Sequence, residues 1–195
     1  LEKVKELHLF NKGLTDVTGL EKLTKLEFLP LQNNKLTNVK ELEKLTQLTR
    51  LWLFNNQLTD VPKGLENLTQ LTNLQLSNNR LTDMKGLEKL TKLKGLELAN
   101  NRLTDVKGLG KLTQLTYLKL GGNQLTEAPQ GLEKLTQLQN LELWSNQLTE
   151  APQGLEKLTQ LKMLSLANNQ LTDVKGLENL TQLEYLNLWG NKLTS

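Results

Sequence analysis

An eleven-residue leucine pattern, repeated nine times, constrains the fold of this chain more than any other feature. The pattern is L-x-x-L-x-L-x-x-N-x-L, and its copies recur every 22 or 23 residues. Leucine repeats of this period form solenoids, in which each copy packs against its neighbours and all copies share one core. We therefore expect residues 1–195 to form a single elongated domain of nine repeats. The Asn positions are Asn34, Asn56, Asn79, Asn101, Asn123, Asn146, Asn169 and Asn191, with Lys12 in the first copy.

Each copy predicts a short strand followed by a bend. In the third copy Leu51 and Leu53 alternate with residues 50, 52 and 54, so the leucines should point inward and the other three outward. Successive strands should lie in parallel, about 4.8 Å apart, which gives a sheet of nine strands. The Asn at the bend can both donate and accept. We expect the Asn side chains to satisfy buried backbone groups of the turn.

The segment that returns to the next strand is too short for a full α-helix. The stretch LEKLTQL occurs identically at residues 42–48, 132–138 and 155–161, and we expect 3₁₀ or short helical turns there. The 23-residue copies carry a proline, at Pro62, Pro129 and Pro152. Strands stack more closely than helical turns, so the solenoid should curve with its sheet on the concave side. The predicted class is an α/β solenoid with a horseshoe shape.

Pro30 conflicts with this scheme, because it falls in the middle of the strand predicted for the second copy. A proline donates no hydrogen bond to a neighbouring strand. Either the sheet tolerates a gap there, or the outward positions vary with little regard for the sheet.

The pattern resembles the leucine-rich repeat family over the whole chain. The 22-residue copies, such as LTDVKGLEKLTKLKGLELANN, are similar to the internalin-like bacterial class, and the proline-bearing copies to longer bacterial and receptor-type repeats. The resemblance implies a horseshoe that binds macromolecules through its concave sheet, and it favours a secreted or cell-surface bacterial protein. We recognise no capping motif at either end of this chain and no signal peptide.

Composition argues against catalysis and against several kinds of partner. His8 is the only histidine and cysteine is absent, so Cys-His chemistry is impossible and a Ser-His-Asp site would need His8. No nucleotide-binding or zinc-protease motif occurs, and we expect no cofactor and no metal. A net charge of +3 is small, and the outward strand positions sum to −1, which does not suit nucleic acid. No apolar run is long enough to span a membrane.

Two charged columns have ordinary structural explanations. An acidic residue or Asn follows the turn in most copies, where it should cap a turn rather than bind calcium. Basic residues directly after the Asn position should keep one rim solvated. The first column comprises Asp16, Asn38, Asp60, Asp83, Asp105, Glu127, Glu150 and Asp173, and the second comprises Lys35, Arg80, Arg102 and Lys192.

All eight aromatic residues fall at the three outward positions of the predicted strands. Rings also suit strands for structural reasons, but residue identity changes from copy to copy while the leucine frame stays constant. We interpret these positions as a recognition surface with two aromatic groups, in copies 1 to 3 and 6 to 9, separated by a polar stretch. The candidate ligand-binding residues are Phe10, Phe28, Arg50, Trp52, Phe54, Tyr117, Lys119, Glu142, Trp144, Met163, Tyr185 and Trp189.

The sequence thus predicts a non-enzymatic module that binds a protein, peptide or glycan through its concave face. An engineered binder scaffold is one alternative. Another is self-assembly end to end, since core leucines such as Leu7, Leu9, Leu186, Leu188 and Leu193 belong to the terminal copies, whose strands would have free edges.

Overall fold

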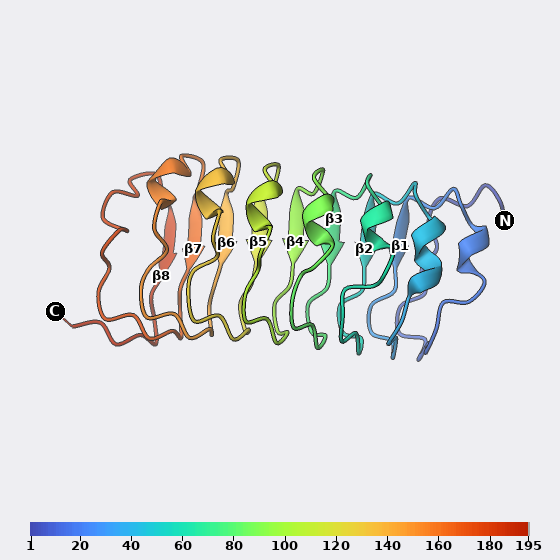
Figure 1. Cartoon of the computed structure of the whole chain (residues 1–195), viewed down its shortest axis with the longest axis horizontal. Helices are drawn as coiled ribbons and strands as arrows, with labels where there is room; N and C mark the ends of the chain where they lie inside the picture. Colours follow the sequence, from blue (N-terminus) through green and yellow to red (C-terminus); the bar gives the residue numbers. More distant parts are fainter. Residues whose placement is uncertain (195) are drawn as a thin grey trace.

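The computed structural model describes residues 1–194, and the predicted domain therefore lies within the described part except for Ser195. Its strands form one parallel sheet in chain order, and short 3₁₀ segments run along the opposite side of the solenoid (Figure 1). The strands are β1 (Phe28–Pro30), β2 (Arg50–Trp52), β3 (Asn73–Gln75), β4 (Gly95–Glu97), β5 (Tyr117–Lys119), β6 (Asn140–Glu142), β7 (Met163–Ser165) and β8 (Tyr185–Asn187).

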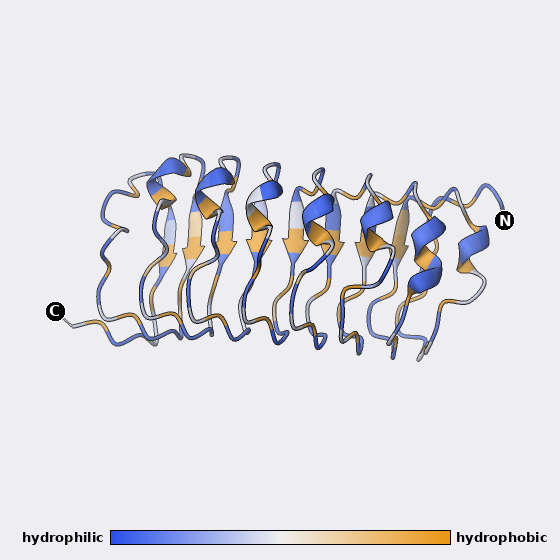
Figure 2. Ribbon diagram, viewed as in Figure 1, coloured by the Kyte–Doolittle hydropathy of each residue, from blue (hydrophilic) through white to orange (hydrophobic). Residues whose placement is uncertain are grey.

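Leucines fill the space between the sheet and the 3₁₀ segments. The central residue of every strand is a leucine, and in-register pairing aligns these residues, as in the pair Leu51 and Leu74. Both are fully buried, as are the leucines two positions further along from β1 to β7, such as Leu53. The alternation of hydrophobic and hydrophilic residues along each copy is visible in Figure 2. One continuous core cluster extends from Val17 to Leu180, as the repeat predicts.

The return segments form 3₁₀ helices, as expected from their length. Most begin after a glycine with positive φ, such as Gly64 at 86°. Copy 2 has Glu41 at the equivalent place, and its helix starts earlier and spans five residues, because glutamate avoids the left-handed conformation that glycine adopts there. The helices are η1 (Leu20–Lys22), η2 (Lys40–Lys44), η3 (Leu65–Asn67), η4 (Leu87–Lys89), η5 (Leu109–Lys111), η6 (Leu132–Lys134) and η7 (Leu155–Lys157).

The Asn column satisfies the backbone of the turns, as predicted. Asn101 is buried; its Oδ1 accepts from the backbone N–H of Leu81 at 2.9 Å, and its Nδ2 donates to the carbonyls of Leu76 and Leu98 at 3.0 and 3.1 Å. Each Asn thus links its own turn to the preceding copies. The same contacts recur from Asn34 to Asn191.

The acidic column caps turns only in the 22-residue copies. Asp83 accepts from the backbone N–H of Lys85 at 2.9 Å, and Asp173 accepts from that of Lys175 at 2.9 Å. In the proline-bearing copies the residue two positions later is proline, for example Pro62 after Asp60, and proline has no N–H to donate. The turn-capping prediction is therefore confirmed for the shorter copies.

The sheet has eight strands within residues 1–194, one fewer than predicted. The segment of the first copy runs alongside β1 but makes only an isolated parallel bridge, between Glu6 and Phe28. Its outward residues still lie in line with those of the sheet, since Leu7 and Leu9 donate to the carbonyls of Phe28 and Pro30 at 3.4 and 3.1 Å.

Pro30 explains the missing strand. The backbone N–H of Phe28 reaches the carbonyl of Lys5 at 3.1 Å, and in a regular parallel ladder the N–H of residue 30 would reach the carbonyl of Leu7. Proline cannot make this bond. On its other side β1 pairs fully with β2, so the gap predicted as one alternative is confined to the edge that faces the first copy.

A column of left-handed residues precedes the Asn column and was not predicted. Asn33, Asn55, Asn78 and their equivalents have φ between 55° and 58°, and Gly122 has 66°. Asn and Gly tolerate this conformation best. Ser145 adopts it as well, with φ of 49°, so the seventh copy carries a local backbone cost that the other copies avoid.

Replacing Ser145 by glycine is expected to stabilise the protein, whereas alanine should not. Glycine removes the Cβ that disfavours positive φ, a difference of about 1 kcal/mol relative to alanine. For a domain of this size that corresponds to a melting temperature roughly 2–4 °C higher. Thermal unfolding of Ser145→Gly and Ser145→Ala measures the difference, and equal melting temperatures would contradict the assigned strain.

Candidate functional site

The outward positions of the strands form a single surface, here called the sheet face. In-register pairing aligns them in columns across the sheet, for example Trp52 beside Gln75 and Glu97 beside Lys119. The structure therefore places the predicted site residues on one side of the molecule. The first column contains Phe28, Arg50, Asn73, Gly95, Tyr117, Asn140, Met163 and Tyr185.

At the N-terminal end of the sheet face the rings pack against one another. The Phe28 and Trp52 rings meet edge to face with centroids 4.9 Å apart, and Trp52 and Phe54 are 6.2 Å apart. His8 links Phe28 to Phe10, at 5.7 and 6.1 Å. Tilted and edge-to-face pairs at these distances are favourable beyond simple burial. The four predicted aromatic residues of copies 1 to 3 thus form one cluster.

Phe28 lies beneath this cluster rather than at its surface. Its residue exposure is only 7%, and the Arg50 guanidinium carbon lies 3.9 Å from the centre of its ring. Arg50 is held from its other side by Glu6, with the nearest nitrogen and oxygen 3.5 Å apart. Of the residues predicted to touch a ligand in this half, Phe10, Arg50, Trp52 and Phe54 remain at least partly exposed.

In the middle of the sheet face Tyr117 lies across a glycine of the preceding strand. A Cβ at Gly95 would collide with the Tyr117 ring, so the ring can pack at this position only because residue 95 has no side chain. The Tyr117 hydroxyl accepts a hydrogen bond from Nδ2 of Asn73, two strands away. The Asn73 Oδ1 in turn accepts from the indole Nε1 of Trp52 at 3.0 Å.

Asn73 therefore links the two aromatic groups that we predicted to be separated by a polar stretch. Aromatic side chains extend over the polar stretch between the groups, because Trp52 and Tyr117 both hydrogen bond to Asn73 and Tyr117 covers Gly95. Neither Asn73 nor Gly95 was among the site residues predicted from the sequence. The available signal was the spacing, because an aromatic residue follows each of the outward glycines Gly95 and Gly121 one repeat later.

Trp144 repeats this arrangement at the other end of the strands. Its indole lies against Gly121 and Gly122, where a Cβ at Gly121 would collide with the ring. Its Nε1 donates to the Glu142 carboxylate at 3.2 Å. These two contacts hold one side of the indole on the backbone and fix its orientation on the sheet face.

The charged residues of the middle column alternate in sign. Lys119 lies between Glu97 and Glu142 in the register, and its Nζ is 3.6 Å from a Glu97 oxygen. These three half-buried side chains carry a local net charge of −1. The charge argues for ligands other than polyanions on this part of the surface.

The last copies expose the remaining predicted residues to different degrees. Met163 is half-buried, whereas Tyr185 is 51% exposed and Trp189 is 75% exposed. No later strand pairs with β8 within residues 1–194. Trp189 therefore offers more free ring surface than Trp52 or Trp144, but with fewer contacts to hold it in place.

Burial raises the pKa of the Tyr117 hydroxyl, and the negative charge of Glu97 raises it further, while the hydrogen bond from Asn73 acts in the opposite direction. In the folded protein the Tyr117 hydroxyl therefore stays protonated at a pH where the same hydroxyl in the unfolded chain, with an ordinary pKa near 10, loses its proton. Below that value the contribution to stability is complete, and it is lost as pH rises from about 10 through the folded pKa.

Because the pKa of Tyr117 is raised in the folded protein, we expect one of the tyrosine hydroxyls to titrate at unusually high pH when tyrosinate absorbance is followed in alkaline solution. In the wild type one component should appear above the ordinary tyrosine range, and Tyr117→Phe should remove it. The same variant should lose less stability than the wild type as pH rises beyond about 10. A late component that persists in Tyr117→Phe would show that the shifted group is a different one.

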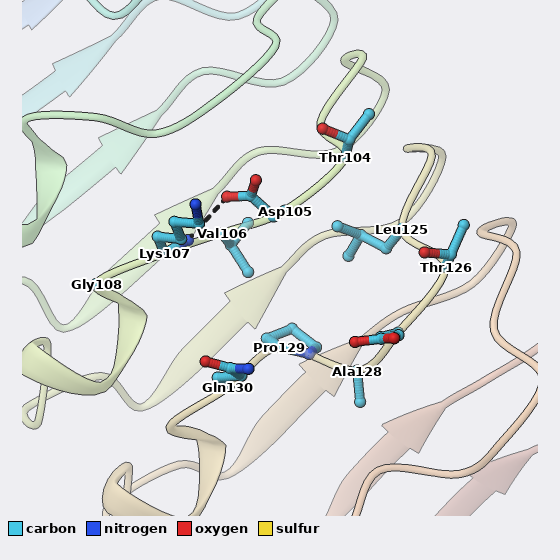
Figure 3. A pocket seen from close by; sticks show the side chains of 11 residues that line it. Thr104, Asp105, Val106, Lys107, Gly108, Leu125, Thr126, Ala128, Pro129 and Gln130 are labelled. Carbon is cyan, nitrogen blue, oxygen red and sulfur yellow. Dashed lines mark hydrogen bonds between the residues drawn. The ribbon is translucent and has the colours of Figure 1, made fainter.

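One cavity between neighbouring copies contains none of the predicted site residues. It measures about 320 Å³ and lies between the return segments of copies 5 and 6 (Figure 3). Here a 22-residue copy, with Val106 and Lys107, meets a proline-bearing copy, with Ala128 and Pro129.

Two further properties bear on function. In residues 1–194 no helix is long and apolar enough to cross a membrane. Over the same residues no group of three or more His, Asp or Glu side chains is arranged to hold a metal ion.

Family models match along most of the chain. The model described as leucine-rich repeat region matches residues 97–195. The model described as leucine-rich repeats in two copies matches residues 24–67, 46–89 and 69–111. No curated protein sequence gives a significant match.

Solved structures with the same fold include bacterial internalins. Internalin C2 from Listeria monocytogenes is 32% identical over 97% of this chain and 80% of its own, with a TM-score of 0.89. An internalin (inlF) from the same species is 33% identical, with a TM-score of 0.85, over 92% of this chain and 53% of its own. This chain thus spans about half of the latter protein.

A plant receptor also has a similar structure. The leucine-rich repeat ectodomain of the membrane receptor kinase GASSHO1/SCHENGEN3 from Arabidopsis thaliana, solved in complex with CASPARIAN STRIP INTEGRITY FACTOR 2, is 28% identical over 98% of this chain and 28% of its own, with a TM-score of 0.81. Together with the repeat pattern, the family models and the internalins confirm the predicted solenoid. The chain belongs to the leucine-rich repeat family, and its repeats are internalin-like.

Proposed function

We propose that this protein is a non-enzymatic binding module that recognises a protein or peptide through the sheet face. The observation that carries the proposal is the concentration of all eight aromatic residues on that face. At Gly95 and Gly121 the lack of a side chain lets two of the rings pack directly against the backbone of the sheet. A side chain held in this way loses little conformational freedom when a partner binds.

The energetics of such a surface are adequate for specific binding. Buried Trp, Tyr and Arg anchors contribute about 2 kcal/mol or more each at protein interfaces. Association costs roughly 4–15 kcal/mol. The exposed and half-exposed anchors Trp52, Tyr117, Trp144, Tyr185 and Trp189 together can offset that cost.

The comparisons support a partner of the protein class. The similar plant ectodomain is described in complex with CASPARIAN STRIP INTEGRITY FACTOR 2, and we extend macromolecular binding from it to this chain. Glycans are an alternative ligand class, since partly exposed aromatic rings also suit sugars. The single histidine, His8, packs against Phe10, Phe28 and Glu6, which favours a structural role for it over a catalytic one.

A binding screen on protein and glycan arrays tests this function. The wild type is compared with a variant in which Trp52, Trp144 and Trp189 are alanine, and with a control in which the exposed Lys44, Lys89 and Lys157 of the 3₁₀ helices are alanine. We expect a wild-type hit that the lysine variant keeps and the tryptophan variant loses. A hit that survives in the tryptophan variant would place recognition elsewhere on the solenoid.

Self-association is a second candidate role. Leu186 and Leu193 of the last copy are 42% and 41% exposed, beside the exposed Trp189, and an open strand edge invites pairing with another chain. Contact of this surface with a second copy would produce mass that rises with concentration in light scattering. A constant monomer mass at high concentration would reject this role.

A further inference from the structure

The aromatic rings in the two halves of the sheet face have different charged neighbours. In the N-terminal half Arg50 lies over the Phe28 ring at 3.9 Å, and the Glu6 carboxylate approaches Arg50 to 3.5 Å. The protein itself therefore supplies the ring, the cation and the carboxylate in this half. Such a set combines a cation–π contact with an ion pair.

The C-terminal half contains the ring and the carboxylate without the cation. Trp144 donates its indole N–H to Glu142 at 3.2 Å, which keeps the carboxylate beside the ring. Within residues 1–194 no Lys or Arg nitrogen lies within 4.0 Å of the Glu142 carboxylate. The neighbouring Lys119 pairs with Glu97 instead, at 3.6 Å.

We infer that Glu142 and Trp144 form a subsite for a cationic side chain of the bound peptide, arginine above all. This inference rests on the proposed function and specifies the chemistry of its ligand. The cation would lie against the indole and pair with the carboxylate, as Arg50 does with Phe28 and Glu6. Arginine fits best because its planar guanidinium can stack on a ring while its N–H groups reach a carboxylate.

Charge and burial on this part of the sheet face support a cation rather than an anion. Glu97 and Glu142 outnumber Lys119, so the middle column there carries a net charge of −1. All three side chains are half-buried, which lowers screening by solvent relative to a fully exposed surface. The small residues Ser165 and Ala167 occupy the adjacent outward positions of the next copy, so the side chains of that copy directly beside Glu142 and Trp144 are small.

Two terminally blocked tripeptides test the subsite: acetyl-Gly-Arg-Gly-amide and the same peptide with neutral citrulline in place of arginine. Binding is followed by NMR through the three indole N–H signals, with Trp144→Phe identifying that of Trp144. We expect a saturable shift of the Trp144 signal with the arginine peptide, at least about fivefold weaker with citrulline and weaker at high salt.

Glu142→Gln is the decisive variant, because glutamine keeps an oxygen that can accept from the Trp144 indole but carries no charge. It should weaken binding of the arginine peptide at least about fivefold and remove the preference over citrulline. Glu156→Gln, which changes an exposed carboxylate of η7 on the opposite side, should leave binding unchanged.

Equal binding of the two peptides, or no loss in Glu142→Gln, would overturn the subsite. So would a shift confined to the Trp52 or Trp189 signal. A partner from the array screen that needs the tryptophans but no cationic residue of its own would contradict only this inference and leave the proposed function intact. A partner unaffected by the tryptophan substitutions would contradict the proposed function itself.

Discussion

Replacing Asn101 by alanine is expected to lower the free energy of unfolding by about 3–5 kcal/mol. The substitution leaves the buried N–H of Leu81 without its partner and removes one of the two donors to each of the carbonyls of Leu76 and Leu98, which keep Asn79 and Asn123. An unsatisfied buried N–H costs about 1–3 kcal/mol, and each further hydrogen bond lost costs about 0.5–1.5 kcal/mol. Urea unfolding followed by circular dichroism measures the loss.

Asn191→Ala is the matched control for this prediction. Asn191 makes equivalent bonds to Leu171, Leu166 and Leu188 but is only half-buried. Water can replace part of its role, so the loss should be about 1–2 kcal/mol. If the two variants were equally stable, the Asn column would not derive its importance from burial.

Replacing Gly95 by valine is expected to destabilise the wild type by about 1–3 kcal/mol through overpacking. The new side chain would collide with the Tyr117 ring and break the contact of Tyr117 with Asn73. In a Tyr117→Ala background the same change should be nearly neutral or stabilising, because valine suits a strand better than glycine does.

A double-mutant cycle of Gly95→Val and Tyr117→Ala therefore measures the energetic coupling between residue 95 and the Tyr117 ring. The coupling energy should fall in the range of about 0.5–3 kcal/mol that is typical of side chains in direct contact. Additive effects of the two substitutions would mean that the glycine does not position Tyr117.

The repeat period predicted most of the fold because it acts at every copy. The inward leucines, the buried Asn column, the 3₁₀ return segments and the placement of the rings on one face all follow from alternation and spacing. The count of nine strands was wrong by one. The deciding residue, Pro30, was recognised in the sequence, but its effect depends on which edge of β1 lacks the N–H.

The details of the candidate site were harder to predict, since they depend on contacts between copies. Neither Gly95 nor Asn73 has a distinctive motif, and each acquires its role from a residue 22 or 44 positions away. Similarly, Phe28 fits the pattern of an exposed anchor but is buried, because Arg50, Trp52 and His8 pack against it.

The affinity of the screened partner for Trp144→Ala, compared with Lys157→Ala, tests most directly whether the sheet face is the recognition surface. Trp144 is held on that face by Gly121 and Glu142, whereas Lys157 is exposed on η7. We expect Trp144→Ala to weaken binding by about 30-fold, corresponding to roughly 2 kcal/mol, and Lys157→Ala to change it less than about twofold. A partner that binds Trp144→Ala as tightly as the wild type but loses affinity for Lys157→Ala would contradict the account and place recognition on the opposite side.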